Sequence, residues 1–164
     1  MSVIRTLYVD DEPGLLEVVK AFLEHSGHFD VKTFSSVADA LIALSAEKFD
    51  VILSDYQMPV MDGIAFLKKV KEEHIGIPFV LFTGKGREEV AIEAINNGAD
   101  FYIRKGGDTK SQFAELINAI NQAVARKEAE EALTYNLRHF RTLIENATDI
   151  IAEKGNHPIG PISR

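Results

Sequence analysis

The fold is decided by the stretch FDVILSDYQMPVMDG, which occupies residues 49–63. The apolar residues 51–53 predict a short strand buried on both faces, and such strands are typical of a parallel sheet covered by helices. This strand ends at Asp55, and the turn-forming pairs Met-Pro and Asp-Gly follow it. Open α/β folds bind their ligands at the carboxyl edge of the sheet. We therefore interpret Asp55 as a functional carboxylate and expect it to accept a phosphoryl group.

Segments on both sides of this stretch predict an alternation of strands and helices. The other expected strands are residues 4–9, 31–34, 79–82 and 101–103. The expected helices begin at or near Pro13, Ser35, Gly63, Glu88 and Ser111. Strands that alternate with helices form a parallel sheet with right-handed crossovers. The expected fold class is therefore α/β, a doubly wound parallel sheet of five βα units with a C-terminal helical extension.

Four of the expected strands are followed at once by polar residues that could bind a metal ion or take part in a reaction. These residues are Asp10, Asp11, Asp55, Thr83 and Lys105. In a parallel sheet all of these positions lie on one edge, so their side chains can meet in one pocket. Two like charges about 4 Å apart repel by roughly 4 kcal/mol at an effective dielectric of 20, so three carboxylates there require a cation. Mg²⁺ (or Mn²⁺) suits such oxygen ligands, and together with Lys105 and Thr83 it would hold the oxygens of a transferring phosphoryl group.

Each of these residues has an ordinary interpretation when it is taken alone. An aspartate after a strand is often a turn former or a helix cap, which is how we interpret Asp62. A threonine at a strand end reflects β-propensity, and a lysine there is usually solvated. What favours a functional site is the joint order: an acid pair after the first strand, then Asp55, Thr83 and Lys105 after the third, fourth and fifth.

The composition limits the classes of partner to consider. The 164 residues include 18 basic and 25 acidic side chains, which gives a formal net charge of −7. We do not expect such an acidic chain to bind nucleic acid or an anionic membrane. The chain has no cysteine, which fits a reducing compartment. We find neither a signal peptide nor a run of roughly 20 apolar residues, so we expect a cytoplasmic location without a membrane span.

The motifs resemble those of the receiver domain of two-component response regulators over about residues 3–124. The resemblance is carried by VDDE at 9–12, SDYQMPVMDG at 54–63, TG at 83–84, NGAD at 97–100 and Lys105. It implies a flavodoxin-like fold in which Asp55 takes its phosphoryl group from a histidine kinase or a phosphotransfer domain. It also implies that Mg²⁺ is bound by Asp10 or Asp11, by Asp55 and by the backbone carbonyl of Gln57, with the second acid of the pair as the usual direct ligand.

The resemblance assigns roles to the remaining residues as well. Thr83 and Lys105 would contact the phosphoryl oxygens, and Thr83 and Tyr102 would form the switch. The ordinary interpretation of Tyr102 is a half-buried aromatic residue of a strand. One departure concerns the position after the lysine, where the family usually has a cis-proline and this chain has Gly106-Gly107. We expect this loop to be more flexible and Lys105 to be held less rigidly.

The C-terminal part predicts an appendage to a receiver domain at 1–124. We expect one helix from about 111 to 140, in which residues 125–140 form a connecting helix rich in Ala, Glu and basic residues. Apolar side chains recur there every three or four positions, at Leu133, Leu137, Phe140 and Ile144. A second copy of the chain would cover this stripe in a coiled coil, whereas the alternative is a frayed tail.

Residues 141–164 are expected to hold the start of a PAS-like sensor domain and a disordered tail. The segment FRTLIENATDIIA at 140–152 resembles the opening of such a domain, and the tail is expected from Gly155 onward. We therefore interpret the chain as a receiver from a longer signalling protein, such as a sensor histidine kinase with an N-terminal receiver.

Two other functions deserve comparison on the same fold class. A phosphatase with an aspartate nucleophile often needs a second acid two residues later, and here that residue is Gln57, which cannot shuttle a proton. A nucleotide or flavin binder needs a glycine-rich first turn, whereas Asp11 and Glu12 would repel phosphates. The favoured function is a module that catalyses only its own Mg²⁺-dependent phosphorylation and dephosphorylation at Asp55. It would switch its association with partners or with itself, and it is not expected to be a turnover enzyme.

Overall fold

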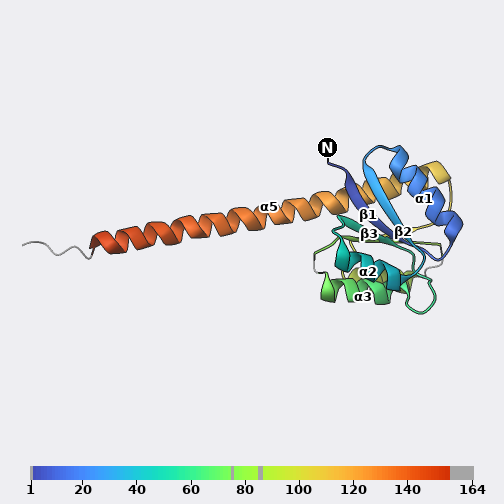
Figure 1. Ribbon diagram of the computed structural model, residues 1–164, viewed down its shortest axis with the longest axis horizontal. Helices are drawn as coiled ribbons and strands as arrows, with labels where there is room; N and C mark the ends of the chain where they lie inside the picture. Colours follow the sequence, from blue (N-terminus) through green and yellow to red (C-terminus); the bar gives the residue numbers. More distant parts are fainter. Residues whose placement is uncertain (1, 75, 85–86, 156–164) are drawn as a thin grey trace, which may run out of the picture. The chain divides into compact units, whose positions relative to one another are not determined.

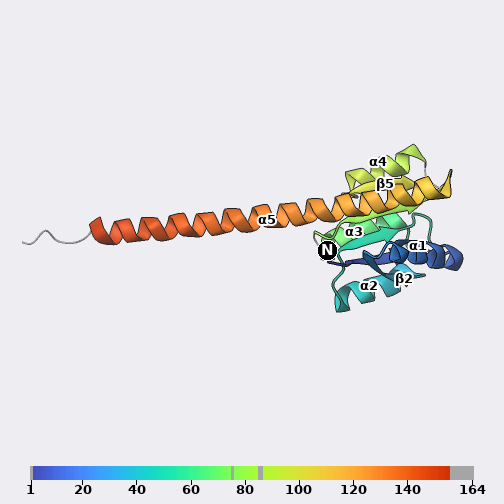
Figure 2. The same ribbon diagram turned by 90° about the horizontal axis from the view of Figure 1, so that it is seen from above.

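The computed structural model describes residues 2–74, 76–84 and 87–155 of the chain. Over these residues, five strands form one parallel sheet in the order β2-β1-β3-β4-β5 (Figure 1, Figure 2). The strands are β1 (Ile4–Val9), β2 (Phe29–Phe34), β3 (Val51–Ser54), β4 (Phe79–Thr83) and β5 (Phe101–Arg104). The helices are α1 (Pro13–His25), α2 (Val37–Ala46), α3 (Gly63–Glu73), α4 (Glu88–Asn96) and α5 (Thr109–Gly155). The predicted flavodoxin-like α/β fold with a C-terminal helical extension is confirmed.

Helices cover both faces of the sheet, and each face has its own core. On one face α1 and the first part of α5 pack on side chains such as Tyr8, Leu53 and Phe82. On the other face α2, α3 and α4 pack on side chains such as Leu7 and Ile52. Neighbouring residues of a strand alternate between the two faces, which is why the strands are apolar at nearly every position.

The strand order places the reversal of the chain's winding between β1 and β3. These two strands pair in register from Thr6 with Val51 to Val9 with Ser54. The pairing continues past the strand ends, because the Asp55 N–H donates to the Val9 carbonyl at 2.9 Å. The carboxyl ends of the strands beside such a reversal are where doubly wound folds bind ligands.

The turn after β3 depends on the glycine of the Asp-Gly pair. Asp62 caps α3, since its carboxylate accepts the Ala65 N–H at 2.8 Å. The Gly63 N–H donates to the Tyr56 carbonyl at 2.8 Å, which brings the helix start against the loop. A Cβ atom at Gly63 would collide with the Asp55 carbonyl oxygen and lie 2.8 Å from a methyl carbon of Leu81. The interpretation of this pair as turn chemistry is therefore correct, and the turn fixes the segment that follows Asp55.

The last helix is longer than the sequence predicted. The expected end near residue 140 is wrong, since α5 runs to Gly155 and includes the segment compared with a PAS opening. The physical reason is that α5 contains no proline, and no glycine before its last residue. The chain divides into two compact units, residues 1–127 and 128–164, and α5 contributes to both. The predicted disordered tail falls on residues 156–164, outside the described residues.

Two smaller differences concern element boundaries. β2 begins at Phe29, two positions before the predicted start, and α5 begins at Thr109 instead of near Ser111.

Within the described part of the chain, no helix combines the length and the apolar character needed to cross a bilayer.

Candidate functional site

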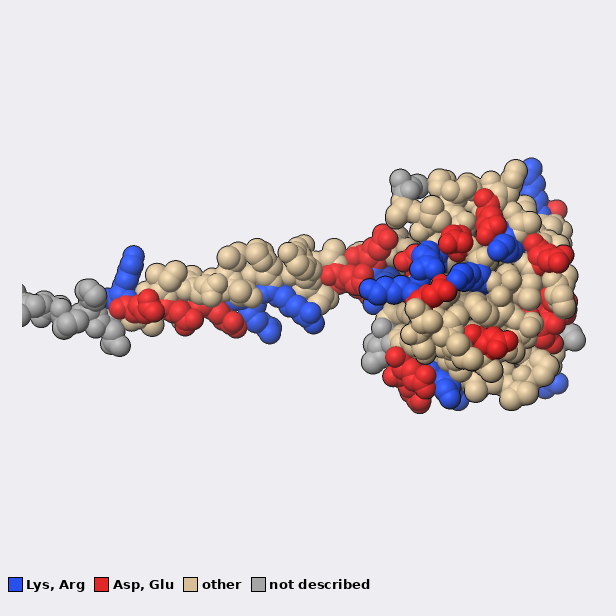
Figure 3. Space-filling view, viewed as in Figure 1, with Lys and Arg blue, Asp and Glu red and all other residues tan. Residues whose placement is uncertain are grey.

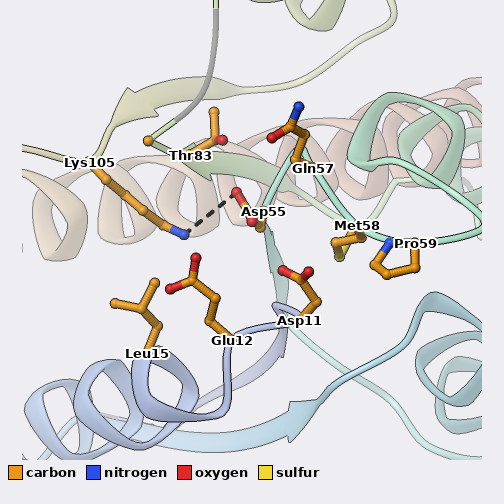
Figure 4. Close-up of a pocket in the computed structure, with 10 residues that line it drawn as sticks. Asp11, Glu12, Leu15, Asp55, Gln57, Met58, Pro59, Thr83 and Lys105 are labelled. Atoms are coloured by element: carbon orange, nitrogen blue, oxygen red, sulfur yellow. Dashed lines mark ion pairs between the residues drawn. The ribbon is translucent and has the colours of Figure 1, made fainter.

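A hollow of about 420 Å³ opens at the carboxyl edge of the sheet, beside the ends of β1, β3, β4 and β5. Figure 4 shows its lining, to which four loops contribute. The residues predicted from the sequence that line it are Asp11, Asp55, Gln57, Thr83 and Lys105. Asp11 and Lys105, which lie far apart in the sequence, thus share one cavity.

Three carboxylates meet at this edge. One oxygen each from Asp10, Asp11 and Asp55 can be chosen so that all lie within 4.8 Å of one another. Asp10 is completely buried and Asp55 is 6% exposed, whereas Asp11 is exposed. Clustered carboxylate oxygens with one exposed member fit a hard divalent cation such as Mg²⁺, which binds few protein ligands and keeps several waters.

Lys105 supplies the positive charge inside the cluster. Its Nζ lies 2.8 Å from Oδ2 of Asp10 and 3.5 Å from Oδ1 of Asp55, and the side chain is only 15% exposed. The Lys105 N–H donates to the Thr83 carbonyl at 2.9 Å, which extends the β4–β5 ladder to this residue. One partly buried ammonium group is therefore shared between two buried carboxylates.

The surroundings of Asp55 act on its charge in opposite directions. Burial raises its pKa, and the Asp10 carboxylate adds to this effect. The Lys105 ammonium group, a hydrogen bond from the Thr83 hydroxyl and the Tyr56 N–H act to lower the pKa, but the net pKa lies above the ordinary value. The pocket thus holds its central carboxylate in a state that additional positive charge would stabilise.

Asp10 and Asp11 differ in what their oxygens already bind. Oδ2 of Asp10 accepts from Lys105 and from the Tyr8 hydroxyl, both at 2.8 Å. Its Oδ1 accepts the Glu12 N–H at 3.0 Å. Asp11 faces the hollow with an exposed carboxylate (Figure 4). The geometry therefore favours Asp11 over Asp10 as a direct metal ligand.

The loop after β5 is stabilised by the following helix. Gly106 has a φ of +134° and Gly107 a φ of +83°, both in the region that favours glycine. The Gln112 side-chain amide donates to the carbonyls of Arg104 and Gly106 at 3.0 and 3.2 Å. Asp108 caps α5 by accepting from Ser111. Where the sequence predicted a loosely held Lys105, the structure shows side-chain hydrogen bonds to the loop on both sides of it.

Tyr102 lies apart from the pocket lining. It is half-buried in β5 and packs against the core cluster under α2, α3 and α4. Burial raises the pKa of its hydroxyl, and this buried oxygen has no hydrogen-bond partner among the described residues. Its predicted switch role stays a prediction.

Reasoning from the sequence assigned no role in the site to several lining residues. They are Glu12, Leu15, Met58, Pro59 and Gly84. Glu12 and Leu15 could have been found, because the first turn of α1 follows the acid pair directly. Tyr8 carried no such signal, since a tyrosine inside an apolar strand looks like any other core residue.

Comparison with known proteins agrees with this geometry. Residues 6–121 match the response regulator receiver domain family. The chain belongs to this family. Among solved structures, this receiver is similar to a CheY-like receiver domain protein from Methanospirillum hungatei, with 29% identity, a TM-score of 0.71 and coverage of 79% of this chain and 99% of the other. A receiver domain protein from Clostridium thermocellum is 32% identical, with a TM-score of 0.70 and coverage of 77% and 98%.

Two curated relatives extend beyond the length of this chain. The receiver is 32% identical over 151 residues to the C4-dicarboxylate transport transcriptional regulatory protein DctD of Rhizobium meliloti, covering 92% of this chain and 31% of the relative. It is 34% identical over 128 residues to the response regulator Rre1 of Synechocystis, covering 77% of this chain and 54% of the relative. The chain thus spans from a third to about half of these relatives.

These relatives also bear on the expected partners. The name of DctD describes a transcriptional regulator, so the expectation that nucleic acid is excluded as a partner finds no support in the comparisons. The match to the receiver family ends at residue 121 and does not extend to the segment compared with a PAS domain.

Proposed function

We propose that this receiver is the phosphoacceptor of a two-component phosphorelay and that Asp55 is the phosphorylated residue. The single observation that carries the proposal is the cluster in which Asp55 lies with two further acids, a partly buried ammonium group and a hydroxyl. The donor would be the phosphohistidine of a histidine kinase or of a phosphotransfer domain.

The reaction requires in-line transfer to a carboxylate oxygen. A bond forms between an Asp55 oxygen and phosphorus while the bond from phosphorus to the imidazole nitrogen breaks, and the electron pair stays on that nitrogen. Lys105 would turn from Asp55 and Asp10 to a phosphoryl oxygen, and the Thr83 hydroxyl would donate to another. Such transfers depend mainly on positioning and charge stabilisation. A cation held by Asp11, Asp55 and the Gln57 carbonyl would neutralise developing negative charge.

Hydrolysis of the aspartyl phosphate would reverse the switch without making this receiver a turnover enzyme. A phosphatase with the same nucleophile is the second candidate. Gln57 stands two residues after Asp55 and faces the pocket, and it has no proton to shuttle. The lining thus supports a phosphorylated state that persists rather than one that turns over rapidly.

The test is phosphorylation by acetyl phosphate and binding of beryllofluoride, each with and without Mg²⁺. We expect both in the wild type only with Mg²⁺, and neither in Asp55→Asn. Asp39→Asn, which neutralises an exposed acid in the first turn of α2, serves as the matched control and should behave like the wild type. Phosphorylation of the Asp55→Asn variant by acetyl phosphate would overturn the assignment of Asp55 as the phosphorylated residue.

We further propose that the C-terminal helix binds a second copy of the chain. Its apolar side chains occupy alternating spacings of four and three positions, at Leu133, Leu137, Phe140, Ile144, Ala147 and Ile151. The large ones among them are between 50% and 71% exposed. Figure 3 shows that most charged side chains of the outer part of α5 lie along one side of the helix. This heptad spacing is what a two-stranded coiled coil requires.

The flanking positions are compatible with a parallel pairing. Asn136 would face Arg141 of the second copy and Leu143 would face Thr148, so no like charges oppose one another. Sedimentation of Leu137→Glu combined with Ile144→Glu should show a monomer where the wild type shows a dimer. Tyr135→Glu, at an exposed position outside the stripe, should leave the dimer intact. A wild type that remains monomeric at high micromolar concentration would contradict self-association.

We also propose that Asp55 phosphorylation acts on partners through Thr83 and Tyr102, and that the segment from residue 141 leads into a PAS-like domain of a longer signalling protein. The Tyr102 hydroxyl supports the first point, because it is buried and has no hydrogen-bond partner among the described residues that would hold it in place. Chemical shifts of Tyr102 with and without beryllofluoride would test it, and unchanged shifts would refute it.

A further inference from the structure

Tyr8 connects the core of the receiver to its acid pocket. Its side chain is completely buried in the core between the sheet and the helices α1 and α5. Residues two apart in a strand point to the same face, so the Tyr8 ring lies beside Asp10, which follows β1. The Tyr8 hydroxyl donates to Oδ2 of Asp10 at 2.8 Å. A core residue thus donates a hydrogen bond to Asp10, the buried member of the acid cluster beside the pocket.

The donors to Asp10 differ in how permanent they are. Asp10 is completely buried, and a buried carboxylate is costly unless hydrogen bonds satisfy it. Two of its donors, the Tyr8 hydroxyl and the Glu12 N–H, belong to groups fixed by the fold. The third, the Lys105 ammonium group, is shared with Asp55 and lies at the pocket wall. Only this third donor is placed to leave Asp10 for a ligand.

We propose that Tyr8 is a positioning residue that keeps Asp10 hydrogen-bonded when Lys105 moves to the phosphoryl group on Asp55. The inference rests on the proposed phosphoacceptor function and adds a residue to it. Tyr8 reduces the free-energy cost of moving Lys105 away from Asp10, because the carboxylate keeps a hydrogen bond. It also holds the Asp10 carboxylate in one orientation before and after phosphorylation of Asp55.

The hydroxyl also affects the affinity of the pocket for a cation. Its dipole points its positive end at Asp10 and reduces the negative potential of the acid cluster. Burial and then the Asp10 carboxylate raise the pKa of Tyr8 far above its ordinary value, so the hydroxyl keeps its proton and remains the donor. Removing the hydroxyl therefore has two opposite effects: cation binding becomes tighter, and Lys105 becomes harder to release.

The experiment is Tyr8→Phe in the full chain, measured by titration calorimetry with Mg²⁺ alone and then with beryllofluoride at saturating Mg²⁺. We expect Mg²⁺ to bind about twofold to fivefold tighter. We expect beryllofluoride to bind about tenfold weaker, as the loss of one hydrogen bond to a charged group predicts. Thr6→Val is the matched control, because it removes a buried hydroxyl from the same strand, and this hydroxyl donates to the Ile4 carbonyl and not to the acid cluster. It should change neither affinity.

A double-mutant cycle separates positioning from packing. In a Lys105→Met background the effect of Tyr8→Phe on beryllofluoride should disappear, because Tyr8 acts through the release of Lys105. If Tyr8→Phe weakens the binding of both Mg²⁺ and beryllofluoride, or changes the binding of neither, the inference is overturned and Tyr8 has a packing role. Failure of the wild type to bind beryllofluoride with Mg²⁺ would instead overturn the phosphoacceptor function itself.

Discussion

The two edges of the sheet are both charged, but their charges are arranged in opposite ways. Near the amino end of the sheet, Glu47 accepts from Arg5 at 2.9 Å and from Lys32 at 2.5 Å. Figure 3 shows basic and acidic side chains intermingled on the face that carries β1, β2 and α2. The Lys32 hydrogen bond and then the Arg5 side chain hold the pKa of Glu47 below its ordinary value.

At the carboxyl edge, like charges are crowded together instead. Two buried aspartates share one lysine there, and the pKa of Asp55 is raised. The comparison shows that opposite charges are paired near the amino end of the sheet, where they serve stability alone. The crowding at the pocket is therefore a cost in stability that goes with ligand binding.

The largest expected effect comes from removing the shared charge at the carboxyl edge. Among the described residues, Lys105→Met leaves two buried carboxylates with neutral donors, which should lower the free energy of unfolding by about 3 kcal/mol at pH 7. Urea denaturation without divalent ions measures it, and added Mg²⁺ should recover part of the loss. Lys32→Met at the opposite edge, where the ion pair is exposed, should cost much less. Equal losses would remove the contrast between the edges.

Asp55→Asn should stabilise the receiver, which is the reverse of what removing a well-paired charge does. Burial raises the pKa of Asp55 in the folded chain. The protonated carboxyl group therefore contributes fully to stability below the pKa that Asp55 has in the unfolded chain. That contribution is lost as the pH rises through the folded-state pKa. The variant should therefore be more stable than the wild type at pH 7. Thermal unfolding from pH 4 to 8 in EDTA tests this, and a less stable variant at pH 7 would contradict it.

Backbone strain accompanies charge crowding at the carboxyl edge. Val60, in the loop after β3, is fully exposed and has a φ of +71°, a conformation that β-branched residues rarely adopt. Val60→Asn should raise the unfolding free energy by about 0.5–1 kcal/mol, because asparagine tolerates this region. Chemical denaturation of the variant measures the gain. Val18→Asn, on an exposed position of α1, should give no comparable gain.

The smallest effect is expected at the amino edge. Glu47→Gln should lower the melting temperature slightly at pH 7, because the ionised form is favoured in the folded chain. With a lowered pKa, this stabilisation is present above the unfolded-state pKa and is lost as the pH falls through the folded-state pKa. The difference between variant and wild type should therefore vanish in acid and shrink in high salt. A difference that grows in acid would contradict the assigned ion pairs.

The residues that sequence reasoning found are those that depend on strand ends. A buried strand must end somewhere, and the first polar residue after it is visible in the sequence, as with Asp55 and Thr83. The alternation of strands and helices then places these residues on one edge without any distance being known. The fold class and the gathering of the pocket residues follow from this reasoning alone.

The sequence could not predict side-chain hydrogen bonds between different parts of the fold. The Gln112 amide reaches the carbonyls of Arg104 and Gly106 from the first turns of α5, and no local pattern marks it. The Tyr8 hydroxyl reaches Asp10 from inside a core whose members all look alike in sequence. The end of α5 was misjudged because an apparent domain start was given more weight than the absence of helix-breaking residues.

The backbone at Gly106 has a consequence for engineering chimaeras within the family. A φ of +134° is far from the value near −65° that a proline ring imposes. Grafting the usual proline into this position alone would force the chain away from the carbonyl positions that Gln112 recognises. A successful transplant in either direction would exchange residues 104–112 as one cassette.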